Sequence, residues 1–311
     1  MVMQDIILST TKSLRQLKGI SACIGYFDGF HIGHQSLFNK TLNYARNHDL
    51  QSAIISFDPD PSVVLSPSAK IEHLTSITDR KQLASDYGFD LWISIEFNHE
   101  MAQMPVLDFI HKLKDINIQH LICGYDFKFG RNGLGSTQDL LENQTSDFSV
   151  EVIDPVKYLG EKISTTRIKQ ALKEGQMELV EHLLGRSYIL KGTVVKGRQI
   201  GRTIGYPTAN LKVSDEYIMP KIGVYSGYVI INKLRYSSMI GIGYNPTVTQ
   251  DHVVSLEAHI FDFNQDIYDL EVEFVLKHYV RSEIKFKSLS ELTEQLHLDE
   301  TQCRQLNAND D

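Results

Sequence analysis

The sequence is poor in cysteine and has no long apolar run, and both absences narrow the class of protein. Its three cysteines (Cys23, Cys123 and Cys303) form no C-x-x-C pair. We therefore expect neither a structural zinc site nor a disulfide framework, which favours a reducing compartment. No apolar run approaches the roughly 20 residues that cross a bilayer, and the first residues lack the segment order of a signal peptide. These absences predict a cytoplasmic protein without a membrane contact.

The sequence also has fewer basic than acidic residues. The chain carries 31 lysine and arginine residues against 39 aspartate and glutamate residues, a net charge of −8. This balance disfavours a broad surface for nucleic acid, and nothing in the sequence marks an interface for an obligate protein partner. Hydrophobic residues at 42% and charged residues at 23% are typical of a globular protein. At 311 residues, the chain is long enough to predict two domains.

The first half of the chain alternates short β-like runs with helical patterns. Between the first two runs, Phe38, Leu42 and Ala45 recur at helical spacing, and residues 106–115 repeat that pattern. Alternation of this kind, with nearly continuous apolar strands, predicts a parallel sheet covered on both faces. Such sheets bind ligands beyond the carboxyl ends of their strands. The predicted strands cover residues 21–27, 51–57, 91–97, 120–125 and 149–156.

The second half has a different character. Residues 164–188 form two short helical patterns, with Gly175 as the break between them. Short strands then follow one another with turn residues between them and no helix, which predicts an antiparallel β-barrel. Leu289, Leu292 and Leu296 lie on one face of a last predicted helix. The predicted barrel strands cover residues 188–197, 223–232, 234–243, 255–263 and 269–276, and we place a domain boundary near Gly185.

The stretch IGYFDGFHIGH, residues 24–34, places two histidines three residues apart just after an apolar run. On the first turn of a helix, His31 and His34 face the same way, and Gly33 lets a ligand approach the backbone closely. The N–H groups and partial positive charge of a helix N-terminus suit a phosphate. Taken alone, the pattern also fits one core and one surface histidine, or a metal site that lacks a third ligand.

Two further segments of the first half are unusual. CGYDFKFGRNGLGS, residues 123–136, is rich in glycine and aromatic residues. Phe127 and Phe129 are suited to stack on a flat ring, with Asp126 as a hydrogen-bonding group nearby; an apolar staple over a long loop is the alternative. ISTTRIKQAL, residues 163–172, has Ser164 and Thr165 at a predicted helix start, where alone they are a good N-cap sequence.

A glycine-rich segment opens the second half: GTVVKGRQIGRTIGYPTANL, residues 192–211. It lacks the G-K-[ST] ending of a Walker loop, which excludes a P-loop. A turn with Gly197 and Gly205 on either side of Arg202 can still aim backbone N–H groups at phosphates. Thr208 and Asn210 present hard oxygen ligands suited to Mg²⁺. A flexible hairpin loop with surface charge is the alternative.

Several of these segments resemble motifs of one superfamily. GYFDGFHIGH resembles the G-x-F-D-G-x-H-x-G-H signature of nucleotidylyltransferases, ISTTRIKQAL resembles their second ATP motif, and CGYDFKFG resembles the G-x-D-F-x-F-G motif of prokaryotic FAD synthetases. The resemblance implies a Rossmann-like nucleotidylyltransferase domain over residues 1–184. It implies catalysis by His31 and His34, ATP binding by Gly33, Ser164, Thr165 and Arg167, and flavin binding by Asp126, Phe127 and Phe129.

The second half resembles riboflavin kinases. Residues 192–211 resemble their G-x-x-x-G-R-x-x-G-x-P-T-A-N signature, SLEAHIF matches an E-x-H pattern, and VRSEIKFKSL resembles the closing motif of the family. The resemblance implies an antiparallel β-barrel riboflavin kinase domain over residues 185–311, in which Glu257 accepts a proton from the substrate alcohol. It further implies ATP binding by Gly197, Arg202 and Gly205, Mg²⁺ binding by Thr208 and Asn210, and flavin binding by Arg281.

The chain as a whole is thus similar to prokaryotic bifunctional riboflavin kinase/FAD synthetases. The similarity implies that MgATP phosphorylates riboflavin to FMN in the second domain, and that ATP adenylylates FMN to FAD in the first. Asp60 stands where many relatives carry histidine or glutamine, and a carboxylate repels a triphosphate unless it points away or binds the metal. The alternatives are a kinase with a silent first domain, a flavin-binding regulator without turnover, which would not need Glu257, and a transferase for another alcohol or phosphate ester.

Overall fold

The computed structural model describes residues 3–9, 18–66, 68, 71–197, 199–214, 216–244 and 254–310. The chain divides into two compact units, Met1–Thr165 and Thr166–Asp311. Each unit has its own sheet and its own core, and we describe them separately. The domain boundary between residues 184 and 185 stays a prediction.

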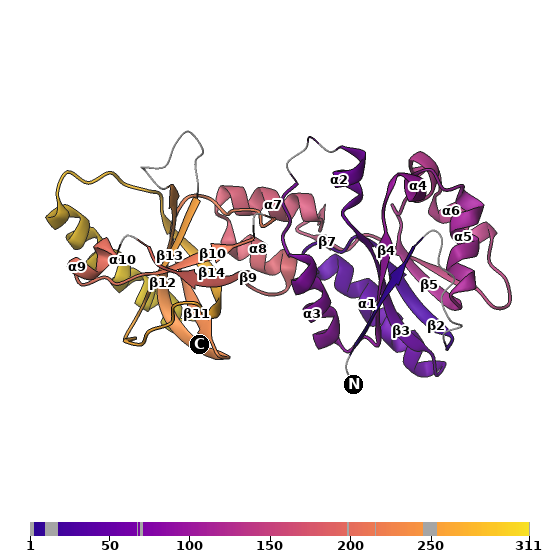
Figure 1. The fold of residues 1–311 in the computed structure, drawn as a ribbon, viewed down its shortest axis with the longest axis horizontal. Helices are drawn as coiled ribbons and strands as arrows, with labels where there is room; N and C mark the ends of the chain where they lie inside the picture. Colours follow the sequence, from indigo (N-terminus) through magenta and orange to yellow (C-terminus); the bar gives the residue numbers. More distant parts are fainter. Residues whose placement is uncertain are drawn as a thin grey trace. The chain divides into compact units, whose positions relative to one another are not determined.

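The first unit is built on a six-stranded parallel sheet with the order β1-β4-β3-β2-β5-β6 (Figure 1). The predicted parallel sheet is confirmed. The edge strand β1 was not predicted, because it is short and three of its five residues are exposed. The strands are β1 (Gln4–Leu8), β2 (Ile20–Ile24), β3 (Gln51–Asp58), β4 (Leu91–Glu96), β5 (Ile118–Gly124) and β6 (Ser149–Ile153), and β7 (Lys157–Tyr158) and β8 (Glu161–Lys162) form a separate hairpin.

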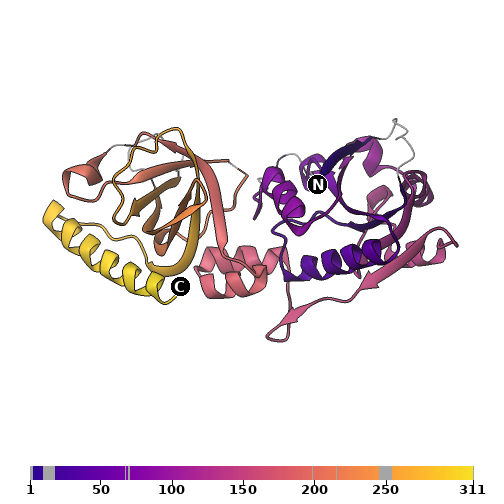
Figure 2. The ribbon, with the colours of Figure 1, turned by 90° about the horizontal axis from the view of Figure 1, so that it is seen from below.

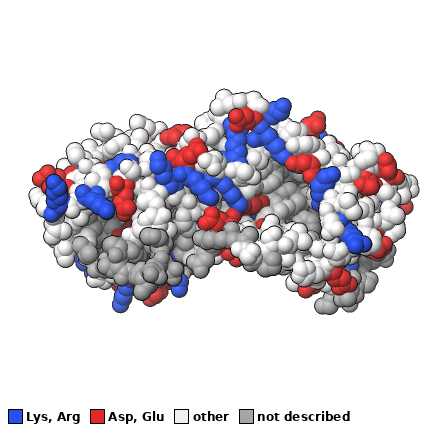
Figure 3. All heavy atoms as spheres, turned by 90° about the horizontal axis from the view of Figure 1, so that it is seen from above, with Lys and Arg blue, Asp and Glu red and all other residues white. Residues whose placement is uncertain are grey.

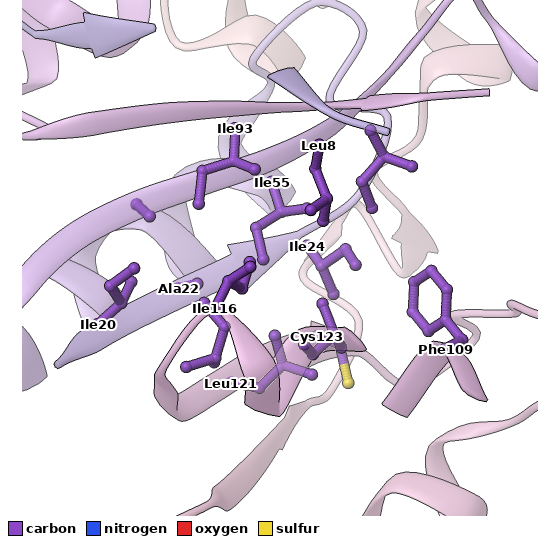
Figure 4. Close-up of a cluster of buried hydrophobic side chains, with 14 of the residues drawn as sticks. Leu8, Ile20, Ala22, Ile24, Ile55, Ile93, Phe109, Ile116, Leu121 and Cys123 are labelled. Carbon is purple, nitrogen blue, oxygen red and sulfur yellow. The ribbon is translucent and has the colours of Figure 1, made fainter. Parts of the chain in front are cut away.

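Alternation along the strands divides the core between the two faces of the sheet. In β2, Ala22 and Ile24 belong to one hydrophobic cluster and Cys23 to another, as the two-residue period of a strand requires. The first cluster, drawn in Figure 4, includes Phe109 of α5, and the second includes Phe38 of α1. The helices of this unit are α1 (Ile32–Asn47), α2 (Pro61–Leu65), α3 (Ile77–Tyr87), α4 (His99–Ala102), α5 (Val106–Asp115), the 3-10 helix η1 (Arg131–Gly133) and α6 (Thr137–Glu142).

The second unit contains a closed antiparallel barrel with the strand order β10-β13-β12-β11-β14-β9. The predicted barrel is confirmed. Strand β10 was not predicted, although its apolar and polar residues alternate, because its first residues belong to the PTAN motif. The strands are β9 (Tyr188–Val195), β10 (Ala209–Val213), β11 (Gly223–Ile231), β12 (Leu234–Tyr244), β13 (Val254–Ile260) and β14 (Glu271–Arg281).

Helices precede and follow the barrel. Helix α7 (Thr165–Glu174) and helix α8 (Met177–Leu184) are separated at Gly175, which has the left-handed φ of 77° that glycine adopts readily. This confirms the predicted break. The short α9 (Ile200–Thr203) interrupts the glycine-rich segment, and the predicted terminal helix is α10 (Leu289–Ala308). Figure 2 shows α10 running along the outside of the barrel.

The three cysteines form no disulfide bond, as expected from the sequence. Cys23, Cys123 and Cys303 are buried and unbridged, and burial raises the pKa of each thiol to about 12. They are therefore core residues and not nucleophiles. None of the helices within the described ranges is both long and apolar enough to cross a membrane.

Candidate active sites

The first candidate site lies where the strand order of the parallel sheet reverses. From β2 the chain passes through α1 to β3 on one side, whereas β5 pairs with β2 on the other side. Ligands of open α/β sheets bind beyond the carboxyl ends of the strands at such a switch point. The FDGFHIGH run follows β2, and the GYDFKFG run follows β5. The topology thus assigns both predicted motifs to one edge of the sheet.

His31 begins helix α1. Its backbone is extended, with φ −66° and ψ 168°, and its Nδ1 accepts a hydrogen bond from the backbone N–H of His34 at 3.2 Å. An imidazole thus does the work of the usual serine or aspartate N-cap. Because Nδ1 is the acceptor, the neutral ring carries its proton on Nε2, which makes that atom a donor.

The rings of His31 and His34 are stacked, with centroids 3.5 Å apart and planes 17° apart. Burial and then the neighbouring His31 hold the pKa of His34 well below its usual value of 6.5, and Lys162 and Arg80 lower it further. Within the described part of the chain, Nδ1 of His34 is buried and has no hydrogen-bond partner. A polar atom of this kind at a helix N-terminus suits a phosphate ligand.

The depressed pKa of His34 predicts an acid-sensitive first unit. Below pH 6.5, His34 is protonated in the unfolded chain but stays neutral in the folded unit. Acidification therefore lowers the free energy of unfolding by up to about 1.4 kcal/mol per pH unit. This penalty is absent above pH 6.5. In His34→Gln, we expect a flatter dependence of the thermal midpoint on pH between about 6.5 and 5. Equal slopes in the two proteins would contradict the assignment.

Asp28 ties the turn before His31 to a distant segment. One carboxylate oxygen accepts hydrogen bonds from the backbone N–H of Leu74 at 2.8 Å and of Thr75 at 3.1 Å. The hydroxyl of Thr165 donates to the backbone carbonyl of Asp28 at 3.2 Å. The two predicted ATP motifs, about 130 residues apart, therefore meet in the folded unit.

Gly33 lies where these motifs converge. A Cβ at this position would lie 3.1 Å from Cε1 and Nδ1 of His31 and 3.6 Å from the carbonyl oxygen of Ile163. A side chain here would crowd the His31 ring. The approach of a ligand to Gly33 stays a prediction. Ser164 directly follows Ile163, whereas Arg167 belongs to the second unit. The ATP roles of Ser164 and Arg167 stay predictions.

A buried cation near this site was not predicted from the sequence. Arg80 of α3 is 3% exposed, and it donates to the backbone carbonyl of Tyr26 at 2.9 Å and to its hydroxyl at 3.0 Å. Its charge also contributes to the lowered pKa of His34. The sequence does not distinguish Arg80, because it belongs to no motif and has charged neighbours on both sides in the same helix.

Asp60, whose carboxylate was expected to repel a triphosphate unless it pointed away or bound a metal, has a local hydrogen-bond partner. Its carboxylate accepts a hydrogen bond from the backbone N–H of Ser62 at 2.6 Å and caps helix α2. A carboxylate oxygen of Asp60 lies 3.8 Å from Nδ1 of His73. An anion is favourable at a helix N-terminus, so the cap accounts for this carboxylate without a metal.

The predicted flavin residues of the first unit have different surroundings. Phe129 is 5% exposed and packs between Phe109, at 5.0 Å, and Phe127, at 5.6 Å between ring centroids. Phe127 is half-buried, and Asp126 is exposed and forms an ion pair with Lys162. Phe129 thus belongs to the core, whereas Asp126 and Phe127 lie nearer to solvent. The flavin roles of all three stay predictions.

The second candidate site lies on the barrel, around Glu257 of β13. Asn210 of β10 is directly opposite Glu257 in the antiparallel ladder, so their side chains project from the same face. The hydroxyl of Thr208 donates to Oε2 of Glu257 at 3.0 Å. Three residues predicted from two separate motifs are therefore neighbours.

Two cavities of different character share Thr208. The first, of about 380 Å³, is lined by Thr208, Glu257 and Arg281 and by apolar side chains, including Leu292 and Leu296 of α10. The second, of about 550 Å³, is lined by Thr208, Arg202 and residues 263–268. A mostly apolar cavity with a carboxylate suits a flat ring that bears an alcohol, and a cavity with an arginine suits phosphates.

Glycines shape the loop between β9 and β10. Gly205 has a left-handed φ of 86°, which a side chain would strain. A Cβ on Gly197 would lie 2.3 Å from Nδ2 and 2.5 Å from Oδ1 of Asn210. The backbone of Gly197 is therefore packed against the Asn210 amide.

This contact predicts a kinase defect in Gly197→Ala. The added methyl group displaces the Asn210 amide, and misplacement of one site group by about 1 Å costs about 100-fold in turnover. We expect a fall of that size in FMN formation from riboflavin, with an unchanged thermal midpoint, because only the end of a side chain must move. Adding Gly197→Ala to Asn210→Ala should cause no further loss. Additive losses would show that Gly197 acts elsewhere.

Arg281 and His259 contact protein groups at the edge of the apolar cavity. The Nε of Arg281 donates to Asp299 of α10 at 2.8 Å, and its Nη2 donates at 2.6 Å. His259, which the sequence offered only as part of an E-x-H pattern, has its Nδ1 2.8 Å from the carbonyl oxygen of Pro207. His259 thus contacts the end of the loop that precedes β10, next to Thr208. A flavin contact of Arg281 stays a prediction.

Comparison with known proteins gives both halves a family. A family model described as riboflavin kinase matches residues 184–307, and one described as FAD synthetase matches residues 13–167. A crystal structure titled macrolide-efflux protein, from Streptococcus pneumoniae, is 32% identical, with a TM-score of 0.87 over 96% of this chain and 99% of that chain.

Curated relatives match nearly the whole chain. The bifunctional riboflavin kinase/FMN adenylyltransferase of Listeria monocytogenes is 36% identical over 90% of each chain. The Bacillus subtilis protein of the same name is 33% identical over 93% of this chain and 92% of that one, and the Escherichia coli protein is 30% identical over 93% of each. The FAD synthetase match covers the unit with the parallel sheet, and the riboflavin kinase match covers the barrel. The chain belongs to the bifunctional riboflavin kinase/FMN adenylyltransferase family.

Proposed function

We infer that this chain converts riboflavin to FMN on its barrel and FMN to FAD on its parallel-sheet unit, with ATP as the second substrate of both steps. The observation that carries the inference is the arrangement of Glu257 and Thr208 in the barrel. Glu257 lines the apolar cavity, and Thr208 joins that cavity to the one with Arg202. A flavin and a nucleotide placed in these cavities meet at Thr208.

The kinase step follows from these side chains. The primary alcohol of riboflavin attacks the γ-phosphorus of ATP, the bond from that phosphorus to the oxygen of ADP breaks, and the carboxylate of Glu257 accepts the alcohol proton. The hydroxyl of Thr208 holds that carboxylate at 3.0 Å. Arg202 lines the nucleotide cavity and balances the charge of the phosphates.

The donor set also fits Mg²⁺. Thr208 and Asn210 supply a hydroxyl and an amide oxygen, which a hard divalent cation prefers, and the backbone of Gly197 packs against the Asn210 amide, which a Cβ would displace. Bound there, Mg²⁺ would neutralise charge on the phosphate oxygens. Thr208 and Asn210 would hold it next to Glu257, the residue that takes the proton.

In the adenylyl step, an FMN phosphate oxygen attacks the α-phosphorus of ATP, and the bond to the β-phosphate oxygen breaks to release pyrophosphate. The Nε2–H of His31 and the ring of His34 stabilise the charge that develops on the phosphoryl oxygens. The N–H groups of the α1 N-terminus hold the phosphates, and Gly33 leaves them room. Asp28 fixes the turn that carries both histidines.

Partners other than substrates and products stay predictions. Figure 3 shows lysine and arginine side chains interspersed with aspartate and glutamate side chains on one face. The expected lack of a nucleic-acid partner rests on the net charge of −8 and stays a prediction. The unbridged cysteines are in keeping with the predicted cytoplasmic location.

Two incubations with MgATP test the function, one starting from riboflavin and the other from FMN, with the flavins separated by chromatography. We expect FAD from both, with FMN as an intermediate in the first. A reaction that stops at FMN would leave a kinase with a silent first unit. If neither flavin reacts, the proposed function is wrong.

A further inference from the structure

We propose that Asp299 is a positioning residue for riboflavin: its ion pair with Arg281 holds the part of helix α10 that forms the wall of the flavin cavity. The inference rests on the proposed kinase function. It assigns to Asp299 a role in binding that the sequence motifs do not indicate, and it makes Arg281 act through α10 and not by contact with the flavin.

The first observation is how α10 is attached. Its buried residues are Asp299, Cys303 and Asn307, a stripe at i, i+4 and i+8 in which two of three side chains are polar. The amide of Asn307 donates to the carbonyl of Gly227 at 2.9 Å and to the hydroxyl of Ser237 at 2.8 Å. These bonds fix the C-terminal end of the helix on the barrel.

The second observation is the position of the cavity along the helix. The cavity is lined by Leu292 and Leu296, which lie in the N-terminal half of α10. This half contributes no buried residue among those that the structure describes. Asp299, one turn beyond Leu296, is therefore the first buried attachment next to the wall.

The third observation is the geometry of the pair. Asp299 is 2% exposed, and both of its oxygens accept hydrogen bonds from Nε of Arg281, at 2.8 and 3.0 Å, while Oδ2 also accepts from Nη2 at 2.6 Å. Gln295 donates to Oδ1 at 2.9 Å. A forked arginine–carboxylate pair fixes both distance and orientation. One edge of the guanidinium is thereby committed to α10.

The experiment compares Asp299→Asn with Asp262→Asn. Asp262 forms an exposed ion pair with Arg304 of the same helix, at 2.8 Å, and does not line the cavity, so this variant is the matched control. We expect Asp299→Asn to raise the riboflavin Kd, followed by flavin fluorescence, and the riboflavin KM by about tenfold. The kcat at saturating riboflavin, the KM for ATP and the conversion of FMN to FAD should stay within about twofold, and the control should be unchanged.

Arg281→Lys separates positioning from direct contact. Lysine keeps the charge but cannot form the forked pair, so Arg281→Lys should raise the riboflavin Kd as Asp299→Asn does. The riboflavin Kd of the double variant should not exceed the higher of the two single-variant values. If Arg281 binds the flavin itself, Asp299→Asn leaves the affinity unchanged while Arg281→Lys lowers it, and the proposal is overturned.

Two further outcomes are informative. If Asp299→Asn lowers kcat as well, the substitution has damaged the barrel. Gln295→Ala is then the variant to measure, because it keeps the charges of Asp299 and Arg281 and removes one hydrogen bond to Asp299. A rise in the riboflavin Kd with unchanged kcat is then expected, and an unchanged Kd overturns the proposal. A wild-type chain that forms no FMN would instead overturn the proposed kinase function.

Discussion

Glu257→Gln is expected to lower FMN formation from riboflavin by about 10²- to 10⁴-fold, the usual contribution of a general base. The amide has nearly the same shape and still accepts the hydrogen bond that Thr208 gives to the carboxylate at 3.0 Å. What it loses is the ability to take the proton of the attacking alcohol. The loss should therefore appear in kcat, with little change in the KM for either substrate.

The same variant should still convert FMN to FAD at the wild-type rate, because that step takes place in the other unit. Glu271→Gln is the matched control, since Glu271 is an exposed carboxylate on strand β14 of the same barrel and lines neither cavity. Product chromatography with riboflavin and with FMN measures both activities. Full kinase activity in Glu257→Gln would exclude Glu257 as the base.

His31→Ala is expected to have the opposite profile. Removal of one donor to a developing phosphoryl charge costs about 10²- to 10³-fold, so FAD formation from FMN should fall by that factor. Riboflavin should still be phosphorylated at the wild-type rate and stop at FMN. The variant also loses the cap of α1, which costs about 1 kcal/mol of stability.

The loss of the cap requires a control for folding. His48 ends the same helix at its other terminus, where its N–H bonds to backbone carbonyls of that helix, so His48→Ala tests general damage to α1. We expect His48→Ala to keep FAD formation. A comparable loss in both variants would show that the defect of His31→Ala comes from the helix and not from the donor.

Local regularity explains what the sequence could predict. The apolar runs of β2 to β5 are nearly continuous, as strands covered on both faces must be, and the clusters on the two faces confirm that reading. The helical spacing of Phe38 and Ala45 and the break at Gly175 also follow from short-range geometry. Elements that depend on residues close in the sequence can therefore be predicted without a structure.

Long-range pairing explains what the sequence could not predict. Arg80 approaches Tyr26 only because α3 packs beside the end of β2, and Asp299 approaches Arg281 only after α10 folds back on the barrel. Neither residue belongs to a motif. Phe129 shows the converse: it stands in a motif, yet its ring is buried by Phe109 and Phe127. Burial of a polar or aromatic side chain depends on which elements meet, and one sequence does not contain that information.

The central claim is that one chain carries two separate sites, and we expect FMN to pass from one site to the other through solution. The most direct test mixes Glu257→Gln with His31→Ala and supplies riboflavin and MgATP. Neither variant alone should give FAD, whereas the mixture should, because the barrel of His31→Ala supplies FMN to the sheet unit of Glu257→Gln. A mixture that forms FMN but no FAD, although Glu257→Gln is active on added FMN, would contradict free passage between the sites. If either folded variant lacks both activities, the assignment of separate sites is wrong.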